Sequence, residues 1–314
     1  YCLVISCYSD SKHNLLFSIN MATTKNAHYI LAIDQGTTSS RAVIFNQQLQ
    51  QIAAAQHELS LSYPQSGWVE QDPQHIWQSV LDCIVEVLSK AGLCAADISG
   101  IAISNQRETT VLWDRHTAKP ISNAIVWQDR RTAAFCKVLQ QRGLEDTISQ
   151  KTGLRADPYF SASKIGWLLD NIAGARAKAE AGQLCFGTID SYLLFKLTAG
   201  KVHATDASNA SRTALYNLTS QNWDPELLQL FNIPAGLLPT IKDCAGVFGT
   251  TSTDVLGAEI PVMAMLGDQQ AALLGQACIS PGMLKSTYGT GCFAMVNTGD
   301  MIVRSKNQLL STLA

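Results

Sequence analysis

The sequence predicts an α/β fold, because apolar strand patterns alternate with amphipathic helical patterns along the chain. Two apolar runs, 29–33 and 41–45, flank a polar turn and indicate paired strands. An apolar stripe at helical spacing extends from residue 73 to residue 91. Further short apolar runs at 98–103 and 261–266 are typical of buried strands, and each is followed by polar residues.

Composition places the chain among globular proteins and excludes several classes. The 314 residues suffice for one large or two ordinary domains, and 46% are apolar against 15% charged. A net charge of −2 gives no electrostatic case for binding nucleic acid or an anionic membrane. No apolar run approaches the roughly 18 residues of a membrane span. The nine cysteines contain no CxxC pair, which favours free thiols in a reducing, cytoplasmic compartment.

Residues 1–27 are expected to be an extraneous or disordered segment. The chain begins at Tyr1, and Met21 is a candidate natural start. The apolar stretches in this segment are short, and no basic leader precedes a sustained apolar core. We therefore expect no secretory signal here.

The remaining elements follow from caps and periodicity. Asp72 and Pro73 suit the start of a helix that ends at Ala91, before Gly92. Asp190 is expected to cap a helix that ends at Leu197, and Arg131 is expected to be solvated. The other expected strands are Gln51–His57 (antiparallel), Val111–Asp114 and Asn123–Trp127, and the other helices are Thr132–Gln141, Ser163–Ile172, Ala173–Ala181 and one from Asp224-Pro225 to Phe231.

The turn between the first two strands has the residues of a phosphate cradle. Gly36 lets the backbone turn so that successive N–H groups point into one concavity. Thr37, Thr38 and Ser39 add hydroxyl donors, and Asp34 at the strand end can hold a hydrated divalent cation. A plain β-hairpin with a polar turn explains these residue types equally well.

Four other positions have both a functional and an ordinary interpretation. The Arg107-Glu108 pair offers a donor fork and an acceptor for neighbouring hydroxyls, but an Arg-Glu dipeptide is usually a solvated ion pair. Trp127 could wall the carbon edge of a polyol or simply pack in the core. Tyr159, taken alone, is a packed loop tyrosine, and Asp268 is most simply the N-cap of a helix.

Two nucleotide-binding motifs are excluded. Residues 289–294 match GxGxxA, but these glycines precede a strand-like segment instead of opening a helix. No GxxxxGK[ST] occurs, so a P-loop kinase is excluded as well.

Five segments carry a resemblance to a known family, and the resemblance extends from about Tyr29 to the last residue. They are DQGTTSSRAV (34–43), NQRETT (105–110), DPYF (157–160), GDQQAALLGQ (267–276) and GMLKSTYGTGCFAMVN (282–297). The chain resembles the FGGY carbohydrate kinases, and within them the members that phosphorylate glycerol. The resemblance implies the actin-like ATPase (ribonuclease-H-like) fold, with a first domain built on a mixed sheet flanked by helices and a second domain only begun.

The resemblance also implies site residues for ATP, Mg²⁺ and glycerol. Asp268 would be the base that accepts the proton of the attacking hydroxyl. The polyol site would consist of Arg107, Glu108, Trp127, Tyr159, Asp268, Gln269 and Phe293. The phosphates would be held by Thr37, Thr38, Ser39, Arg41 and Thr290, and the metal by Asp34. The segment 203–213 also resembles the family, and we assign it a scaffolding role.

The implied domains are an FGGY N-terminal domain over 28–277, with the first phosphate loop and the polyol site, and the start of a C-terminal domain over 278–314. Family members continue further, supply adenosine-binding residues there, and include homo-oligomers among their full-length members. We therefore expect a truncated chain whose terminal hairpin is marginally stable. Two alternatives stay open: another FGGY sugar kinase, such as one for a pentulose, and a non-catalytic fragment that binds polyol only. NQRETT, DPYF and GDQQAA argue against the pentulose.

Overall fold

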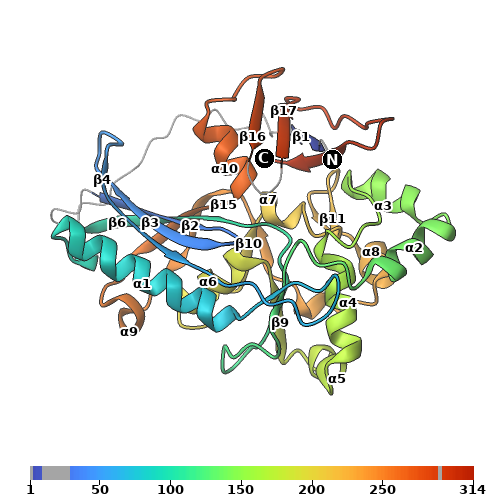
Figure 1. Cartoon of the computed structure of the whole chain (residues 1–314), viewed down its shortest axis with the longest axis horizontal. Helices are drawn as coiled ribbons and strands as arrows, with labels where there is room; N and C mark the ends of the chain where they lie inside the picture. Colours follow the sequence, from blue (N-terminus) through green and yellow to red (C-terminus); the bar gives the residue numbers. More distant parts are fainter. Residues whose placement is uncertain (1–2, 9–28, 289–291) are drawn as a thin grey trace.

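A computed structural model of the chain describes residues 3–8, 29–288 and 292–314. Its centre is a six-stranded mixed sheet (Figure 1). In spatial order the strands are β14 (Ala245–Thr250), β15 (Pro261–Gly267), β6 (Ile98–Asn105), β2 (Tyr29–Gln35), β3 (Ser39–Phe45) and β4 (Gln51–Glu58). The middle strands β15, β6 and β2 are parallel, whereas β14, β3 and β4 join antiparallel. The α/β fold and the antiparallel strand after the first hairpin are confirmed.

Two helices cover one face of this sheet, α1 (Pro73–Ala91) and α6 (Ile189–Leu197). They lie side by side, since the Lys196 ammonium of α6 is 5.5 Å from the ring centre of Trp77 on α1. The α1 boundaries agree with the prediction: Asp72 accepts from the Gln74 N–H, and Gly92 ends the helix at φ 66°. Because such a φ is strained for residues with a Cβ, the glycine gives a sharp stop.

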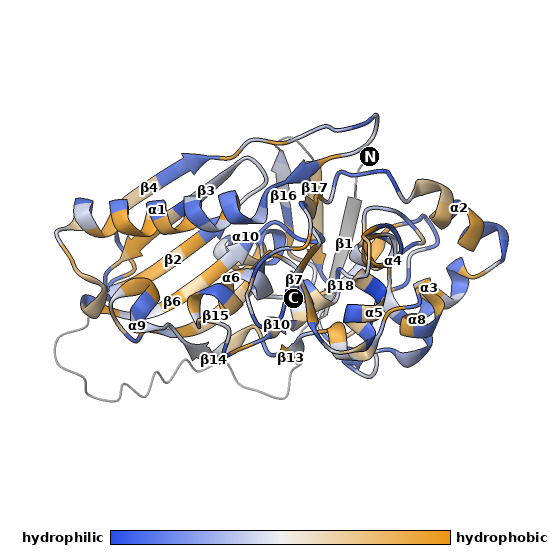
Figure 2. Cartoon of the chain, turned by 90° about the horizontal axis from the view of Figure 1, so that it is seen from below, coloured by the Kyte–Doolittle hydropathy of each residue, from blue (hydrophilic) through white to orange (hydrophobic). Residues whose placement is uncertain are grey.

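Alternation along the strands separates the core from the opposite face. Leu31 and Ile33 of β2 are buried beneath the helices, whereas Asp34 is exposed. Figure 2 shows the hydrophobic residues concentrated in β2 and β6. Alternate residues of β2, such as Leu31 and Ile33, thus face the helices and form the core. The residues that alternate with them, such as Asp34, lie on the opposite face and are available to a site.

A second apolar cluster lies in a helical region beside the sheet. Its helices are α2 (Ala133–Gln141), α3 (Glu145–Thr152), α4 (Ser161–Asn171), α5 (Ala175–Glu180) and α8 (Pro225–Leu230). Four two-stranded sheets contain the remaining short strands, which are β5 (Glu70–Gln71), β7 (Val111–Asp114), β8 (Ala124–Ile125), β9 (Leu184–Gly187), β10 (Ala204–Asp206), β11 (Tyr216–Asn217), β12 (Asn222–Trp223) and β13 (Thr240–Lys242). Short helical turns occur at η1 (Ala95–Asp97), α7 (Ala207–Ala210), η2 (Ala235–Leu237) and α9 (Thr253–Leu256).

The last part of the chain forms a four-stranded sheet on the other side of the central sheet from α1 (Figure 1). Its order is β16 (Leu284–Tyr288), β17 (Cys292–Asn297), β1 (Leu3–Tyr8) and β18 (Leu310–Leu313). The predicted hairpin is confirmed, because β16 and β17 pair antiparallel, although its turn at 289–291 lies outside the described residues. β1 pairs parallel with both β17 and β18, so this part of the segment 1–27 is a strand, while 9–28 lie outside the described residues.

Four details differ from the prediction. The strand expected at 123–127 is only Ala124–Ile125, and Asp190 lies one residue inside α6, whose N-cap is Thr188. Asp190 is fully buried and accepts hydrogen bonds from the hydroxyls of Thr188 and Thr205. Arg131 is not solvated: it pairs with Glu70 and Asp129 and lies 3.8 Å from the Trp68 ring centre. Helix α3 was not expected.

The cysteines of residues 29–288 and 292–314 are free thiols, and four of these seven are buried. Within the described part of the chain, none of the helices has the length and apolar character needed to cross a membrane.

Candidate active site

The carboxyl ends of three parallel strands meet at one edge of the central sheet. Gly267 of β15 and Gln35 of β2 both align with Asn105 of β6. The segments that follow are the start of α10 (Asp268–Gly275), the loop 106–110 and the turn 36–39. In open α/β sheets this edge is where ligands bind. Three motifs that are far apart in sequence therefore converge because of strand register.

The first turn is joined to Trp127 by a hydrogen bond. The indole N–H of Trp127 donates to Thr37 Oγ1 at 2.8 Å, and Gln71 donates to the Thr37 carbonyl oxygen at 2.6 Å. Within the turn, the Gly36 N–H donates to the Ser39 carbonyl oxygen at 2.8 Å. Thr38 is exposed, and its carbonyl oxygen accepts from the Leu59 N–H. The turn is thus held at its base while its hydroxyls stay near the surface.

Asp34 and Arg41 face each other across the first strand pair. They are directly opposite in the β2–β3 register, and both are exposed. Desolvation and then the negative charge of Asp268 raise the pKa of the Asp34 carboxyl, whereas Arg41 lowers it. The ends of β2 and β15 both align with Asn105, so these two carboxylates lie at the same edge of the sheet.

Arg107 connects the loop after β6 to the start of α10. Its side chain is 2% exposed, and Arg107 Nε lies 3.2 Å from Asp268 Oδ1. Arg107 Nη1 donates to Gln270 Oε1 at 3.1 Å. Gly267 is required for this arrangement, because a Cβ there would lie 2.5 Å from Arg107 Cδ.

Glu108 has a different partner from its neighbour. It is 1% exposed, has a φ of 62°, and accepts from Arg212 Nε at 2.6 Å. Its carbonyl oxygen accepts from the Ser161 hydroxyl at 3.0 Å. A positive φ is uncommon outside glycine, so these contacts hold Glu108 in a strained conformation. Arg107 and Glu108 are therefore not a solvated ion pair.

Three aromatic rings complete a continuous series of contacts. The ring centre of Trp127 is 5.6 Å from that of Tyr159 and 6.4 Å from that of Phe293. The Arg107 guanidinium lies 5.9 Å from the Phe293 ring centre, and the Arg212 guanidinium lies 5.5 Å from the Tyr159 ring centre. Burial raises the pKa of the Tyr159 phenol, so its hydroxyl remains a donor.

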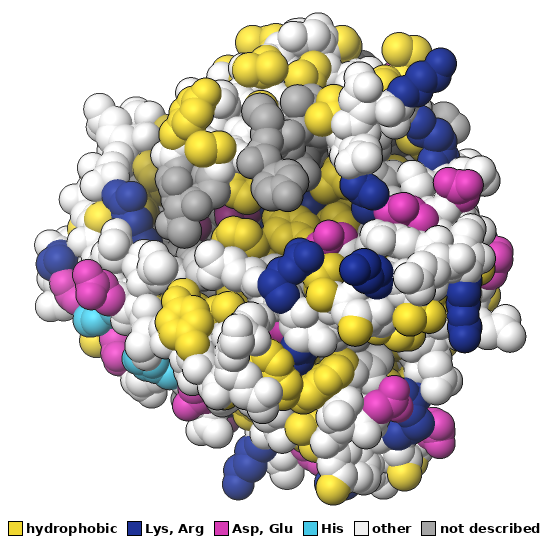
Figure 3. Space-filling model, turned by 45° about the vertical axis from the view of Figure 1, so that its right-hand side comes forward, with side chains coloured by type: hydrophobic (Ala, Val, Ile, Leu, Met, Phe, Trp, Pro, Cys, Tyr) yellow, Lys and Arg dark blue, Asp and Glu magenta, His cyan; other side chains and the backbone are white. Residues whose placement is uncertain are grey.

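The structure thus brings one part of the predicted site residues together, and Thr37 joins this group through Trp127. One series of contacts runs from Glu108 through Arg212, the three rings and Arg107 to Asp268, with Gln269 next in sequence. Thr290 lies outside the described residues. Figure 3 shows a face with a hollow in which hydrophobic side chains are bordered by acidic and basic ones.

Asp268 has the environment of a carboxylate that can exchange a proton. Desolvation raises the pKa of its carboxyl; Arg107 lowers it, and Glu108 raises it. Its Oδ1 accepts from the Gln269 N–H at 2.6 Å. The expectation that Asp268 is an N-cap is wrong: Asp268 is the first residue of α10, whose N-cap is Gly267, and no side chain of the described residues caps this helix. The buried guanidinium of Arg107 lies 3.2 Å from its carboxylate.

Arg212 is a residue of this site that the sequence did not predict. It lies in the segment 203–213, which we took as scaffold, and it is 0% exposed. Its two Nη atoms have no hydrogen-bond partner among the described residues. The available signal was an arginine within a run of small polar residues. If that run is buried, its arginine needs a carboxylate partner, because arginine is rarely buried unpaired.

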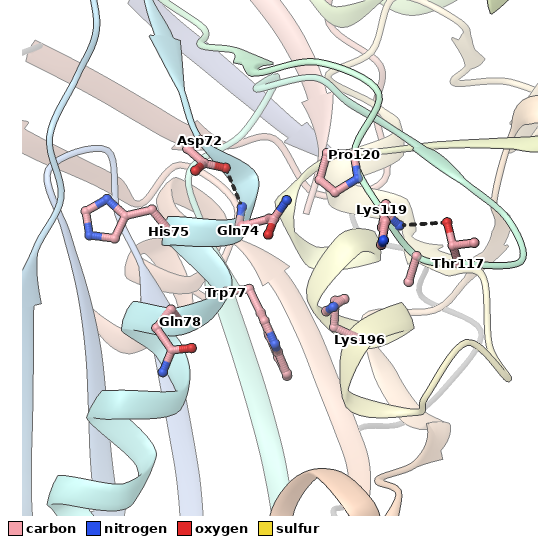
Figure 4. Close-up of a pocket in the computed structure, with 10 residues that line it drawn as sticks. Asp72, Gln74, His75, Trp77, Gln78, Thr117, Lys119, Pro120 and Lys196 are labelled. Atoms are coloured by element: carbon pink, nitrogen blue, oxygen red, sulfur yellow. Dashed lines mark hydrogen bonds between the residues drawn. The ribbon is translucent and has the colours of Figure 1, made fainter.

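A separate cavity of about 460 Å³ lies between α1, α6 and the turn before Pro120 (Figure 4). Its walls include Asp72, Trp77, Lys119 and Lys196. No predicted site residue lines it.

The residues at the strand ends suit magnesium and phosphate. Two neighbouring carboxylates, whose mutual repulsion a cation would relieve, and nearby hydroxyls are the hard oxygen ligands that Mg²⁺ prefers. In the described ranges, no three His, Cys, Asp or Glu side chains are grouped as a metal centre.

Comparison with known proteins identifies the class. The FGGY family of carbohydrate kinases, N-terminal domain, matches residues 29–275, so the chain belongs to this family. The particular similarity is to glycerol kinases: the chain is 59% identical over 286 residues to that of Chelativorans sp. (strain BNC1), and 59% identical over 287 residues to that of Coxiella burnetii (strain RSA 493 / Nine Mile phase I).

Each of these alignments covers 91% of this chain and 57% of the relative. The crystal structure of Plasmodium falciparum glycerol kinase with ADP superposes with a TM-score of 0.85 at 36% identity, over 90% of this chain and 57% of that chain. The expected fold and family are confirmed, and the chain spans less than three fifths of the length of these relatives.

Proposed function

We propose that this chain carries the polyol site and the first phosphate loop of an ATP-dependent kinase that converts glycerol to glycerol 3-phosphate. The observation that carries the proposal is the continuous series of contacts from Glu108 to Asp268 at the carboxyl end of the sheet. The similarity to glycerol kinases supports glycerol over other polyols. In this proposal 28–277 form the FGGY N-terminal domain and 278–314 begin the next.

The polyol is held by two kinds of contact. Arg107 donates to hydroxyl oxygens, and Glu108 accepts from hydroxyl protons. Before the polyol binds, Arg107 is fixed by the buried Gln270 and Glu108 by the buried Arg212. The rings of Trp127, Tyr159 and Phe293 cover the carbon edges. Gln269 binds a second hydroxyl.

Asp268 takes the proton from the attacking hydroxyl. Phosphoryl transfer has a loose transition state, so a weak base that also positions the nucleophile is sufficient. A pKa raised by desolvation brings the carboxylate closer to the range in which a base is effective, and Arg107 opposes its protonation.

The turn after β2 receives the nucleotide phosphates. Thr37, Thr38, Ser39 and Arg41 donate to phosphate oxygens, and Thr290 does so from the second hairpin. Mg²⁺ bound with ATP supplies neutralisation of the charge on the phosphates. Asp34 would hold this ion. The Trp127–Thr37 hydrogen bond ties this loop to the polyol wall.

Glycerol phosphorylation by the parent chain and by Asp268→Asn tests the proposal. We expect formation of glycerol 3-phosphate that depends on ATP and Mg²⁺, and a loss of about a hundredfold or more in Asp268→Asn. Equal rates in the two proteins would contradict the role of Asp268. A parent chain that binds glycerol without phosphorylating it would favour the alternative, a polyol-binding fragment.

A further inference from the structure

A buried lysine lies directly behind one of the proposed polyol contacts. Lys285 is the second residue of β16, pairs with Met295 of β17, and is 5% exposed. Its ammonium donates to Gln269 Oε1 at 2.5 Å. Burying an ammonium is costly unless it is hydrogen-bonded, so this contact is a defined feature of the packing between β16 and α10.

The contact determines which end of the Gln269 carboxamide faces the site. An ammonium has three donors and no acceptor, so it can donate to the oxygen of the carboxamide but cannot bond to its NH₂ group. With Oε1 turned to Lys285, the group left for a ligand is the Nε2 donor. Gln269 is itself 9% exposed, which limits its freedom to rotate.

The neighbouring glutamine has the same arrangement. Arg107 Nη1 donates to Gln270 Oε1, and Gln270 Nε2 donates to the Leu313 carbonyl oxygen at 3.0 Å. Two successive carboxamides at the start of α10 are thus each oriented by a buried cation. Lys285 also lowers the pKa of Asp268, which places its charge close to that carboxylate.

We propose that Lys285 is a positioning residue of the polyol site, which fixes the Gln269 carboxamide so that Nε2 donates to a hydroxyl oxygen of the polyol. This inference rests on the proposed function for the identity of the ligand, but not for the orientation of the amide. It assigns Gln269 as a donor only, so Gln269 recognises the oxygen of a hydroxyl and not its proton.

Two substitutions separate positioning from a merely structural role. Lys285→Met keeps the length of the aliphatic stem and removes the donor. Gln269→Glu keeps, and strengthens, the contact with Lys285 but replaces the Nε2 donor with an acceptor. Lys90→Met, on the exposed end of α1, is the control for loss of a lysine elsewhere.

Glycerol affinity is measured by calorimetric titration. The chemical shifts of the Gln269 side-chain NH₂ group are measured by ¹H–¹⁵N NMR, and the signals that disappear in Gln269→Glu are assigned to this group. We expect Lys285→Met and Gln269→Glu each to weaken glycerol binding about tenfold or more, the effect of one lost hydrogen bond to a polar ligand. In Lys285→Met the two NH₂ signals of Gln269 should move toward the chemical shifts of a freely rotating glutamine side chain. Lys90→Met should change neither quantity.

The inference is overturned if Gln269→Glu has the same affinity for glycerol as the parent. It is also overturned if the Gln269 NH₂ chemical shifts are unchanged in Lys285→Met. If Lys285→Met does not fold, the glycerol affinity of Gln269→Glu still decides the question. If the parent itself does not bind glycerol, the proposed polyol site is wrong, and the amide resonance still decides whether Lys285 orients Gln269.

Discussion

Arg212 Nε donates to Glu108 Oε1 at 2.6 Å, and neither side chain is more than 2% exposed. The two residues are 104 positions apart in sequence. The pair fixes a carboxylate at the proposed polyol site, and the guanidinium also lies 5.2 Å from the Phe160 ring centre.

The first prediction concerns this pair. Arg212→Met leaves the Glu108 carboxylate buried without its cation, and we expect a loss of about 3–5 kcal/mol in the free energy of unfolding. Adding Glu108→Gln should recover part of that loss, because the uncompensated charge is removed. The measurement is urea denaturation. Arg130→Met is the control: its pair with Asp157 is exposed and should contribute less than about 1 kcal/mol. Equal losses in the two arginine variants would contradict the argument.

The second prediction concerns the close approach of Arg107 to the backbone at Gly267. In Gly267→Ala the new Cβ would lie 2.5 Å from Arg107 Cδ and 2.9 Å from Gln270 Oε1. We expect about 1–3 kcal/mol of destabilisation and weaker glycerol binding, because Arg107 must move. Gly236→Ala is the matched control, since nothing lies within 4 Å of its added Cβ. Calorimetric titration with glycerol distinguishes the two, and unchanged affinity in Gly267→Ala would refute the prediction.

The third prediction concerns pH. Burial, and next the charge of Asp206, raise the pKa of the Asp190 carboxyl from its ordinary 3.8 to about 7. The folded chain thus retains a proton that the unfolded chain releases. The contribution of this group to stability is full below its unfolded pKa and is lost as the pH rises through 7. Asp190→Asn removes this dependence.

We therefore expect the parent to lose more stability than Asp190→Asn between about pH 5 and pH 8, measured as the free energy of unfolding in urea. Parallel pH profiles for the two proteins would show that Asp190 is ionised in the folded chain throughout.

Local signals in the sequence predicted the elements whose boundaries depend on local chemistry. Asp72, Pro73 and Gly92 defined α1 because caps act within one turn of the helix. The predicted N-cap role of Asp190 was wrong. Asp190 is a residue type that suits an N-cap, but its carboxylate is buried and accepts hydrogen bonds from Thr188 and Thr205. The hydrogen bond from Thr205, which lies 15 residues further along the chain, is not visible in local spacing.

The site was predicted in part for the same reason. Motifs marked Arg107, Glu108 and Asp268, but their actual partners follow from strand register and from packing between distant segments. Lys285 was missed because its place in a strand-like segment gives no sign that it is buried, and Arg212 because its run of small polar residues was interpreted as scaffold. Only the fold reveals which carboxylate or carboxamide each one faces.

The small molecule that this site binds distinguishes glycerol recognition from the recognition of a larger sugar. Calorimetric titration of the parent chain with glycerol and, separately, with the pentulose xylulose measures this without requiring catalysis. We predict binding of glycerol that is lost in Glu108→Gln and is tighter than any binding of xylulose. Tighter binding of xylulose, or glycerol binding that is unaffected by Glu108→Gln, would contradict the proposed polyol site.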